Sequence, residues 1–158
     1  MIANIQRVES NVLATFERHL NHSIEDVWAM LTDNEKLKQW FAELRVEELR
    51  KGGFILFDMQ NGTFIKMEIL ELKINEVLEF TWDKDVVRFE LNAKPEGCLL
   101  IFKEKINNLT DHTPRDLAGW HVCLDVIEAL LNGETIENRK AEWEKWYPKY
   151  MEAISENK

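Results

Sequence analysis

The sequence is poor in cysteine, proline and glycine, with two, three and six of them among 158 residues. Cys98 and Cys123 lie far apart, and neither belongs to a CxxC motif or to a Cys/His cluster with metal-ligand spacing. We expect both thiols to be reduced and buried. Hydrophobic residues make up 45% and charged residues 31% of the chain, which excludes a disordered or fibrous protein and favours one globular domain across residues 1–158.

Positive charge and long apolar runs are also scarce. Twenty basic residues against twenty-nine acidic ones leave a formal charge of −9, which would repel a nucleic-acid backbone or an anionic membrane surface. The chain contains no run of about 18 apolar residues, and its N-terminal residues do not resemble a secretory signal. We therefore expect no nucleic-acid partner, no membrane insertion and a cytoplasmic location.

Motifs for catalysis or cofactor binding are missing as well. The sequence contains no glycine-rich phosphate loop and no nucleophile elbow. His19 and His22 are three residues apart before a predicted helix, a spacing that is not a recognised ligand pattern. The prediction is no metal, no cofactor and no identified catalytic residue.

Helical periodicity appears in two short segments near the N-terminus. Ser23 begins a capping-box-like start, and apolar residues follow at helical spacing from Ile24 to Leu31. Asp33 offers a second N-cap for a helix that ends near Phe41. We predict one strand from Val12 to Leu20 before these helices, and a tail or loose segment over residues 1–10.

From Gly52 to Ile106 the apolar residues alternate, which is typical of strands. Asn61-Gly62 is a strong hairpin signal between strands expected over 54–59 and 63–73. Further strands are expected over 77–82, around 87–91 and over 98–106, separated by charged or Pro-Gly-containing turns. The pattern predicts an antiparallel meander.

The C-terminal third is predicted to be helical. Thr113 as N-cap, Pro114 at the first helical position and Asp116 in the first turn predict a long helix that ends at Asn132-Gly133. Residues 137–155 are charged and aromatic, and Pro148 predicts a kinked or broken terminal helix there. The aromatic side chains of this extension would pack on the domain or provide a surface for self-association.

The order of these elements resembles the helix-grip architecture of START-like (SRPBCC) domains. Several features lie where that family places them: the helical opening Ser23–Trp28, the pair Gly52-Gly53, the strand ending at Trp82 and the pair Gly119-Trp120. Together they resemble the branch named for the activator of the heat-shock-protein-90 ATPase, over about residues 12–133, with 137–158 as an extension. Cys98 stands where relatives usually carry Thr, and Ile74-Asn75-Glu76 replaces a proline-rich turn. The resemblance implies an α+β fold with a curved antiparallel sheet wrapped around a long C-terminal helix and two short helices after the first strand.

A cavity between this sheet and helix is the candidate site. Inward-facing strand residues would meet one face of the long helix and line an apolar space. The same residues would equally form a solid core if they closed to native packing density. The predicted lining residues are Phe80, Trp82, Phe89, Leu91, Leu100, Phe102, Glu104, Trp120, Cys123, Leu124 and Ile127.

Glu104 and His121 are the polar candidates at this site. Glu104 shares a strand face with Leu100 and Phe102, so it either points into the cavity, where burial would raise its pKa, or lies at a solvated strand end. His121 either contributes to the cavity or lies partly buried on the helix surface.

Three functions remain open from the sequence. The first is non-enzymatic binding of a small apolar or amphipathic molecule in the cavity. The second, implied by the resemblance, is a protein-interaction module that regulates a chaperone ATPase. The third is an enzyme that uses Glu104 and His121 as acid or base, and the residues favour binding over catalysis.

Overall fold

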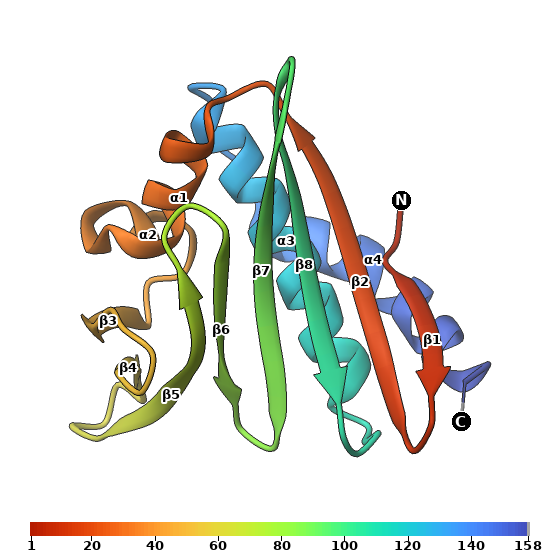
Figure 1. Ribbon diagram of the computed structural model, residues 1–158. Coiled ribbons are helices and arrows are strands. Elements are labelled where there is room, and N and C mark those ends of the chain that lie inside the picture. Colours follow the sequence, from red (N-terminus) through yellow and green to blue (C-terminus); the bar gives the residue numbers. More distant parts are fainter. Residues whose placement is uncertain (158) are drawn as a thin grey trace.

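The computed structural model describes residues 1–157, which form an α+β fold with helices against one face of a curved antiparallel sheet (Figure 1). The sheet has eight strands in the order β1-β2-β8-β7-β6-β5-β4-β3. These strands are β1 (Asn4–Val8), β2 (Asn11–Leu20), β3 (Leu44–Glu48), β4 (Phe54–Asp58), β5 (Phe64–Lys73), β6 (Val77–Trp82), β7 (Asp85–Lys94) and β8 (Gly97–Ile106). The helix-grip arrangement expected from the sequence is confirmed.

Four helices complete the fold, and they are α1 (Ile24–Thr32), α2 (Asn34–Trp40), α3 (Thr113–Leu131) and α4 (Arg139–Ser155). Figure 1 shows α3 behind β7 and β8, and α4 beside it behind β2 and β1. Helix α1 contacts β7 and β8, and helix α2 contacts β3. No helix within residues 1–157 is long and apolar enough to cross a membrane.

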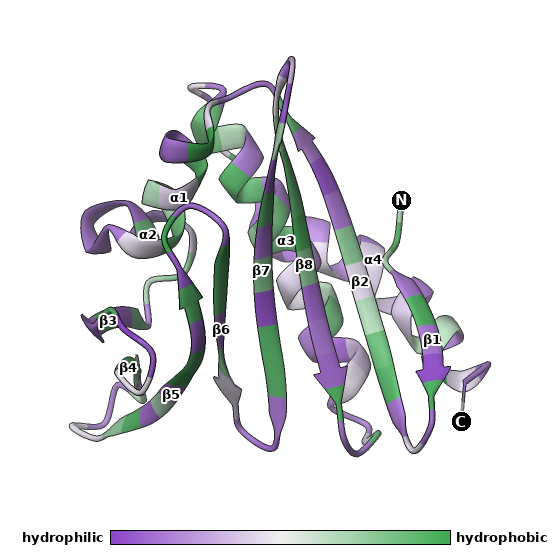
Figure 2. Cartoon of the chain, in the orientation of Figure 1, coloured by the Kyte–Doolittle hydropathy of each residue, from purple (hydrophilic) through white to green (hydrophobic). Residues whose placement is uncertain are grey.

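Alternation along the strands directs one apolar face of the sheet toward α3. On β8 the side chains of Cys98, Leu100, Phe102 and Glu104 are buried, whereas the intervening residues are partly exposed. Phe89 of β7 lies opposite Phe102 in the pairing register, so their rings share this face. The alternation of hydrophobic and hydrophilic residues is visible along the central strands in Figure 2. Burial of this face supplies the main stabilisation of the fold.

The predicted caps of the first two helices are confirmed. Ser23 Oγ accepts a hydrogen bond from Asp26 N at 3.1 Å, and Asp33 Oδ1 accepts from Glu35 N at 3.0 Å. Each bond satisfies one of the free N–H groups at a helix start. Asp33 therefore ends α1 and begins α2, which explains two short helices in place of one long one.

The start of α3 differs from the prediction by one residue. His112 occupies the N-cap position, and Thr113 lies inside the first turn. The Thr113 hydroxyl instead accepts from Thr110 N at 3.0 Å, and so it stabilises the turn that leads into the helix. At the other end, Gly133 has φ +77, the left-handed conformation expected after the helix.

Two strands were missed. Residues 1–10 are not a tail, because Asn4–Val8 pair with residues 11–15 of β2, and Leu44–Glu48 pair with β4. Both are edge strands with one neighbour, and their side chains are mostly exposed or half-buried, so they show little apolar alternation. The two short helices consequently follow the second strand instead of the first.

Pro148 predicted a kinked or broken helix, and of these the break does not occur, because α4 runs through Pro148 as one helix. Proline removes the hydrogen bond to the carbonyl of Glu144, and Glu144 is exposed, so water can satisfy that group. The aromatic residues of α4 pack on the domain. Tyr150 Oη accepts from Ala3 N at 3.0 Å and lies 2.7 Å from His121 Nδ1, and the Trp146 ring stacks on His121.

Candidate functional site

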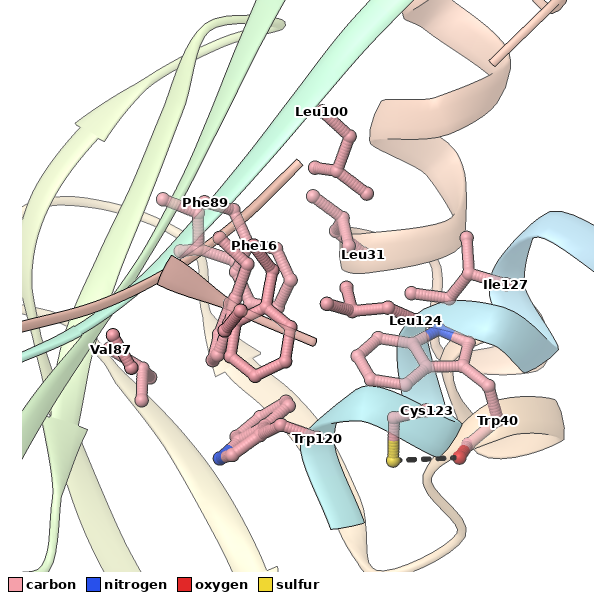
Figure 3. Close-up of a cluster of buried hydrophobic side chains, with 14 of the residues drawn as sticks. Phe16, Leu31, Trp40, Val87, Phe89, Leu100, Trp120, Cys123, Leu124 and Ile127 are labelled. Carbon is pink, nitrogen blue, oxygen red and sulfur yellow. Dashed lines mark hydrogen bonds between the residues drawn. The ribbon is translucent and has the colours of Figure 1, made fainter. Parts of the chain in front are cut away.

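Most of the space between the sheet and α3 is filled by side chains (Figure 3). The ring centroids of Phe89 and Phe102 are 4.8 Å apart, and those of Phe102 and Trp120 are 4.5 Å apart. Such distances leave no room for a ligand between the rings. Nine of the eleven predicted lining residues lie in this packed core: Phe80, Phe89, Leu91, Leu100, Phe102, Trp120, Cys123, Leu124 and Ile127.

Trp82 and Glu104, together with the core residues Trp120 and Cys123, line two clefts at the N-terminal end of α3. We call these the Glu104 cleft, about 500 Å³ in volume, and the Arg139 cleft, about 490 Å³. Trp82, His112 and Asp116 border both clefts. Trp82 Nε1 donates a hydrogen bond to Asp116 Oδ1 at 3.0 Å, which fixes the indole between them.

The Glu104 cleft has an apolar wall and an acidic wall. The apolar wall comes from the β4–β5 hairpin and the end of β6, and its residues are Phe57, Met59, Ile65, Met67 and Trp82. The acidic wall is built by Glu104 on β8, Asp85 on β7 and Asp116 on α3. A concave apolar surface with a few convergent polar groups is typical of a small-molecule site.

Glu104 is the most unusual side chain of this cleft. Its exposed fraction is 1%, and neither carboxyl oxygen has a hydrogen-bond donor among residues 1–157. The pKa of Glu104 is raised well above 4.5, first by burial and then by the neighbouring carboxyl groups of Asp116 and Asp85. Burial therefore favours the protonated form of Glu104, and its side chain borders a cleft.

The strand position explains the burial of Glu104. In the register it lies between Ala14 of β2 and Val87 of β7, both fully buried. The strand continues to Ile106, and residues of the loop leading to α3 line the same cleft as Glu104. Of the two alternatives from the sequence, the buried position applies and the solvated strand end does not.

The neighbouring carboxyl of Asp85 is partly satisfied by the backbone. Asp85 Oδ1 accepts from Asn107 N at 2.9 Å. Burial raises the pKa of Asp85, and this hydrogen bond opposes the rise. The acidic wall therefore combines one anchored carboxylate with the unpartnered acid of Glu104.

The Arg139 cleft is aromatic and partly basic. Trp40, Phe41, Trp120 and Trp143 form its walls, and Arg139 Nη2 donates to the Trp40 carbonyl at 2.9 Å. Cys123 Sγ lies 3.8 Å from the same carbonyl (Figure 3). Burial raises the pKa of the Cys123 thiol to about 12, so it remains protonated and is a poor nucleophile. This cleft lacks the buried acid of its neighbour.

The structure does not bring His121 and Glu104 to one cleft. His121 is buried against Phe16, Trp146 and Tyr150, where α3 meets β2 and α4. Burial is the main cause that lowers the pKa of His121 to about 3. His121 thus links elements of the fold, and an acid–base pair with Glu104 has no geometric support within residues 1–157.

Several cleft residues were not anticipated from the sequence. Met59, Ile65 and Met67 reach the cleft because the sheet curls at the β4–β5 hairpin. Asp116 was recognised only as a helix-start acid, and its bond to Trp82 joins positions 34 residues apart. The alternation along the strand predicts that Met67 faces inward. No local pattern predicts the long-range hydrogen bond between Trp82 and Asp116.

Comparison with known proteins agrees with this architecture. The fold and the clefts place the chain in the helix-grip class. The family described as Activator of Hsp90 ATPase homolog 1-like protein matches residues 21–132, and the chain belongs to this family. The resemblance inferred from the sequence is confirmed. No match is found among curated proteins.

Solved structures extend the likeness to the whole chain. A conserved protein of unknown function from Enterococcus faecalis has 27% identity and a TM-score of 0.87, covering 99% of this chain and 92% of its own. CalU16 from Micromonospora echinospora has 16% identity and a TM-score of 0.71, with 93% and 92% covered. A protein from Bordetella parapertussis has 20% identity and a TM-score of 0.70, with 95% and 91% covered. The last two show a shared fold alone.

Proposed function

We propose that the protein binds a small apolar or amphipathic molecule in the Glu104 cleft, without catalysing a reaction on it. The observation that carries this proposal is a buried acid with no partner at the base of a cleft with an apolar wall. Buried polar groups in folded proteins are normally hydrogen-bonded, and exceptions often mark a site that a ligand completes. We also propose that the protein is cytoplasmic.

The dimensions and lining of the cleft support the proposal. A volume of about 500 Å³ lies within the range of small-molecule sites. Met59 and Ile65, on the apolar wall, have exposed fractions of 44% and 47%. A ligand that covered them would remove apolar surface from water, which contributes about 25 cal/mol per Å².

A fluorescent apolar probe tests this function. N-phenyl-1-naphthylamine, which is uncharged at neutral pH, should bind the protein with increased emission. Ile65→Trp would fill the cleft and weaken probe binding by about tenfold or more. Ile74→Trp is the matched control, because Ile74 is an exposed isoleucine, at 71%, in the turn after β5. Absence of binding, or equal binding by both variants, would contradict the proposal.

A second candidate is contact with a chaperone of the heat-shock-protein-90 class. It is favoured by the family description and by the exposed apolar residues Met59, Phe64 and Ile65 of the β4–β5 hairpin. Such an apolar tip is typical of a contact surface for another protein. A pull-down with the purified chaperone tests it: Phe64→Ser, at 49% exposed, should reduce capture, and no capture of the chaperone by the wild type removes this candidate.

A further inference from the structure

We infer that the ligand of the Glu104 cleft is an amine, whose ammonium group pairs with the Glu104 carboxylate while its apolar part lies against Trp82 and the β4–β5 hairpin. This inference rests on the proposed function, and it adds the chemical class of the ligand. Its structural basis is the combination of unpartnered acceptors on Glu104 with the acidic and apolar walls of the cleft.

The charges that face Glu104 select a cation. Asp116 on α3 and Asp85 on β7 line the same cleft as Glu104, and the strand residues paired with Glu104, Ala14 and Val87, carry no charge. At the rim, Asp83 accompanies Lys84 and His112. A carboxylate ligand would meet like charges at short range, whereas an ammonium group would meet opposite ones.

The hydrogen-bonding requirements of Glu104 also favour an amine. An ammonium group has donors and no acceptor, and once Glu104 is ionised both of its oxygens are acceptors that have no donor within residues 1–157. Asp116 Oδ1 already accepts from Trp82 Nε1, so Asp116 is held in place. Charge-assisted hydrogen bonds are about twice as strong as neutral ones, so an amine would bind better than an alcohol of the same shape. The Trp82 ring also offers a face to a cation.

Binding would release a proton. In the free protein the raised pKa favours the protonated form of Glu104, and the free ligand is an ammonium ion. Formation of the ion pair converts the Glu104 carboxylic acid to a carboxylate, and the proton passes to the buffer. The atoms and charges balance with one proton released for each amine bound to a fully protonated Glu104.

Calorimetry with three probes of one shape tests the inference. The probes are 2-phenylethylamine, 2-phenylethanol and 3-phenylpropionate, which differ in the polar group and its charge. The wild type should bind the amine about tenfold or more tighter than the other two. The amine enthalpy should depend on the ionisation enthalpy of the buffer, with up to about one proton released.

Two variants and a control distinguish a loss of the preference for amines from a loss of ligand binding. Glu104→Gln, which resembles the protonated acid, should keep alcohol binding and lose the preference for the amine. Asp116→Asn should weaken the preference, and Glu96→Gln, in the exposed β7–β8 turn, should keep it. Equal binding of amine and alcohol by the wild type, or an unchanged preference in Glu104→Gln, would overturn the inference while the proposed function stands. No binding of any probe would overturn both.

Discussion

Burial of the Glu104 carboxyl has a consequence for stability as well as for binding. The unfolded chain exposes this group, so it ionises there near its ordinary pKa of 4.5, whereas in the folded state the pKa is raised. As the pH increases above about 4.5, the unfolded state loses its proton first, and the free energy of unfolding therefore falls until the folded pKa is passed.

Glu104→Gln should remove this dependence. The free energy of unfolding of the wild type should fall relative to that of the variant by up to about 1.4 kcal/mol for each pH unit. Urea unfolding of both proteins from about pH 5 to about pH 8 measures the difference between their free energies of unfolding. Groups that titrate alike in the two proteins contribute equally to both, so their contributions cancel in this difference. Parallel pH profiles would show that Glu104 is ionised in the folded protein.

Tyr150 joins the N-terminal segment, α3 and α4 through one hydroxyl. Because Tyr150 Oη accepts from Ala3 N, its own proton is directed at His121 Nδ1. Tyr150→Phe would leave both partners buried and unpaired, and should lower the free energy of unfolding by about 1–3 kcal/mol.

Urea denaturation at neutral pH tests the Tyr150 prediction. The control is Tyr147→Phe, because Tyr147 is half-buried and stacks on Trp143 while its hydroxyl has no hydrogen-bond partner within residues 1–157. Its effect should lie within about 0.5 kcal/mol. Equal losses in the two variants would contradict the role of the Tyr150 hydroxyl.

At the scale of the elements, two glycines should respond to alanine in opposite directions. Gly97 has φ +150 at the start of β8, and a Cβ there would overlap the Leu20 carbonyl oxygen of the neighbouring strand. Gly119 lies in α3 with no atom within 4 Å of an added Cβ, because it borders the Arg139 cleft. Gly97→Ala should destabilise by about 1–3 kcal/mol, and Gly119→Ala should stabilise by about 0.5–1 kcal/mol.

Thermal unfolding of the two glycine variants beside the wild type provides the measurement. Opposite shifts of the midpoint are expected. Shifts of the same sign would mean that the β7–β8 turn can relax or that α3 is strained at Gly119.

Local patterns in the sequence predicted the elements that carry a strong signal. Ser23 and Asp33 as caps, the alternation of β8 and the end of α3 before Gly133 could all be read from side-chain chemistry and spacing. The edge strands β1 and β3 could not, because they bury few side chains and depend on a neighbour that is already in place. The continuity of α4 through Pro148 depends on the exposure of the preceding turn, which is a tertiary property.

At the scale of the whole molecule, the sequence predicted the face that would be buried but not the space left open within it. Phe102 and Glu104 share a strand face, yet one is in a packed core and the other borders a cleft. That difference arises where the rings of Trp82 and Trp120 pack together, with centroids 5.0 Å apart, and where the sheet curls at the β4–β5 hairpin. Side-chain packing of this kind is decided by contacts between distant segments.

The central claim is that the Glu104 cleft is the ligand site of this protein. An assigned ¹H–¹⁵N NMR spectrum, titrated with 2-phenylethylamine, tests it most directly. If the Glu104 cleft is the ligand site, the chemical-shift changes should concentrate at residues that border it. These are Ile65, Met67, Thr113, Asp116 and the Trp82 indole N–H. Shifts confined to the Arg139 cleft, for example at Trp143 and Lys140, or spread along the outer surface of α4, would contradict it.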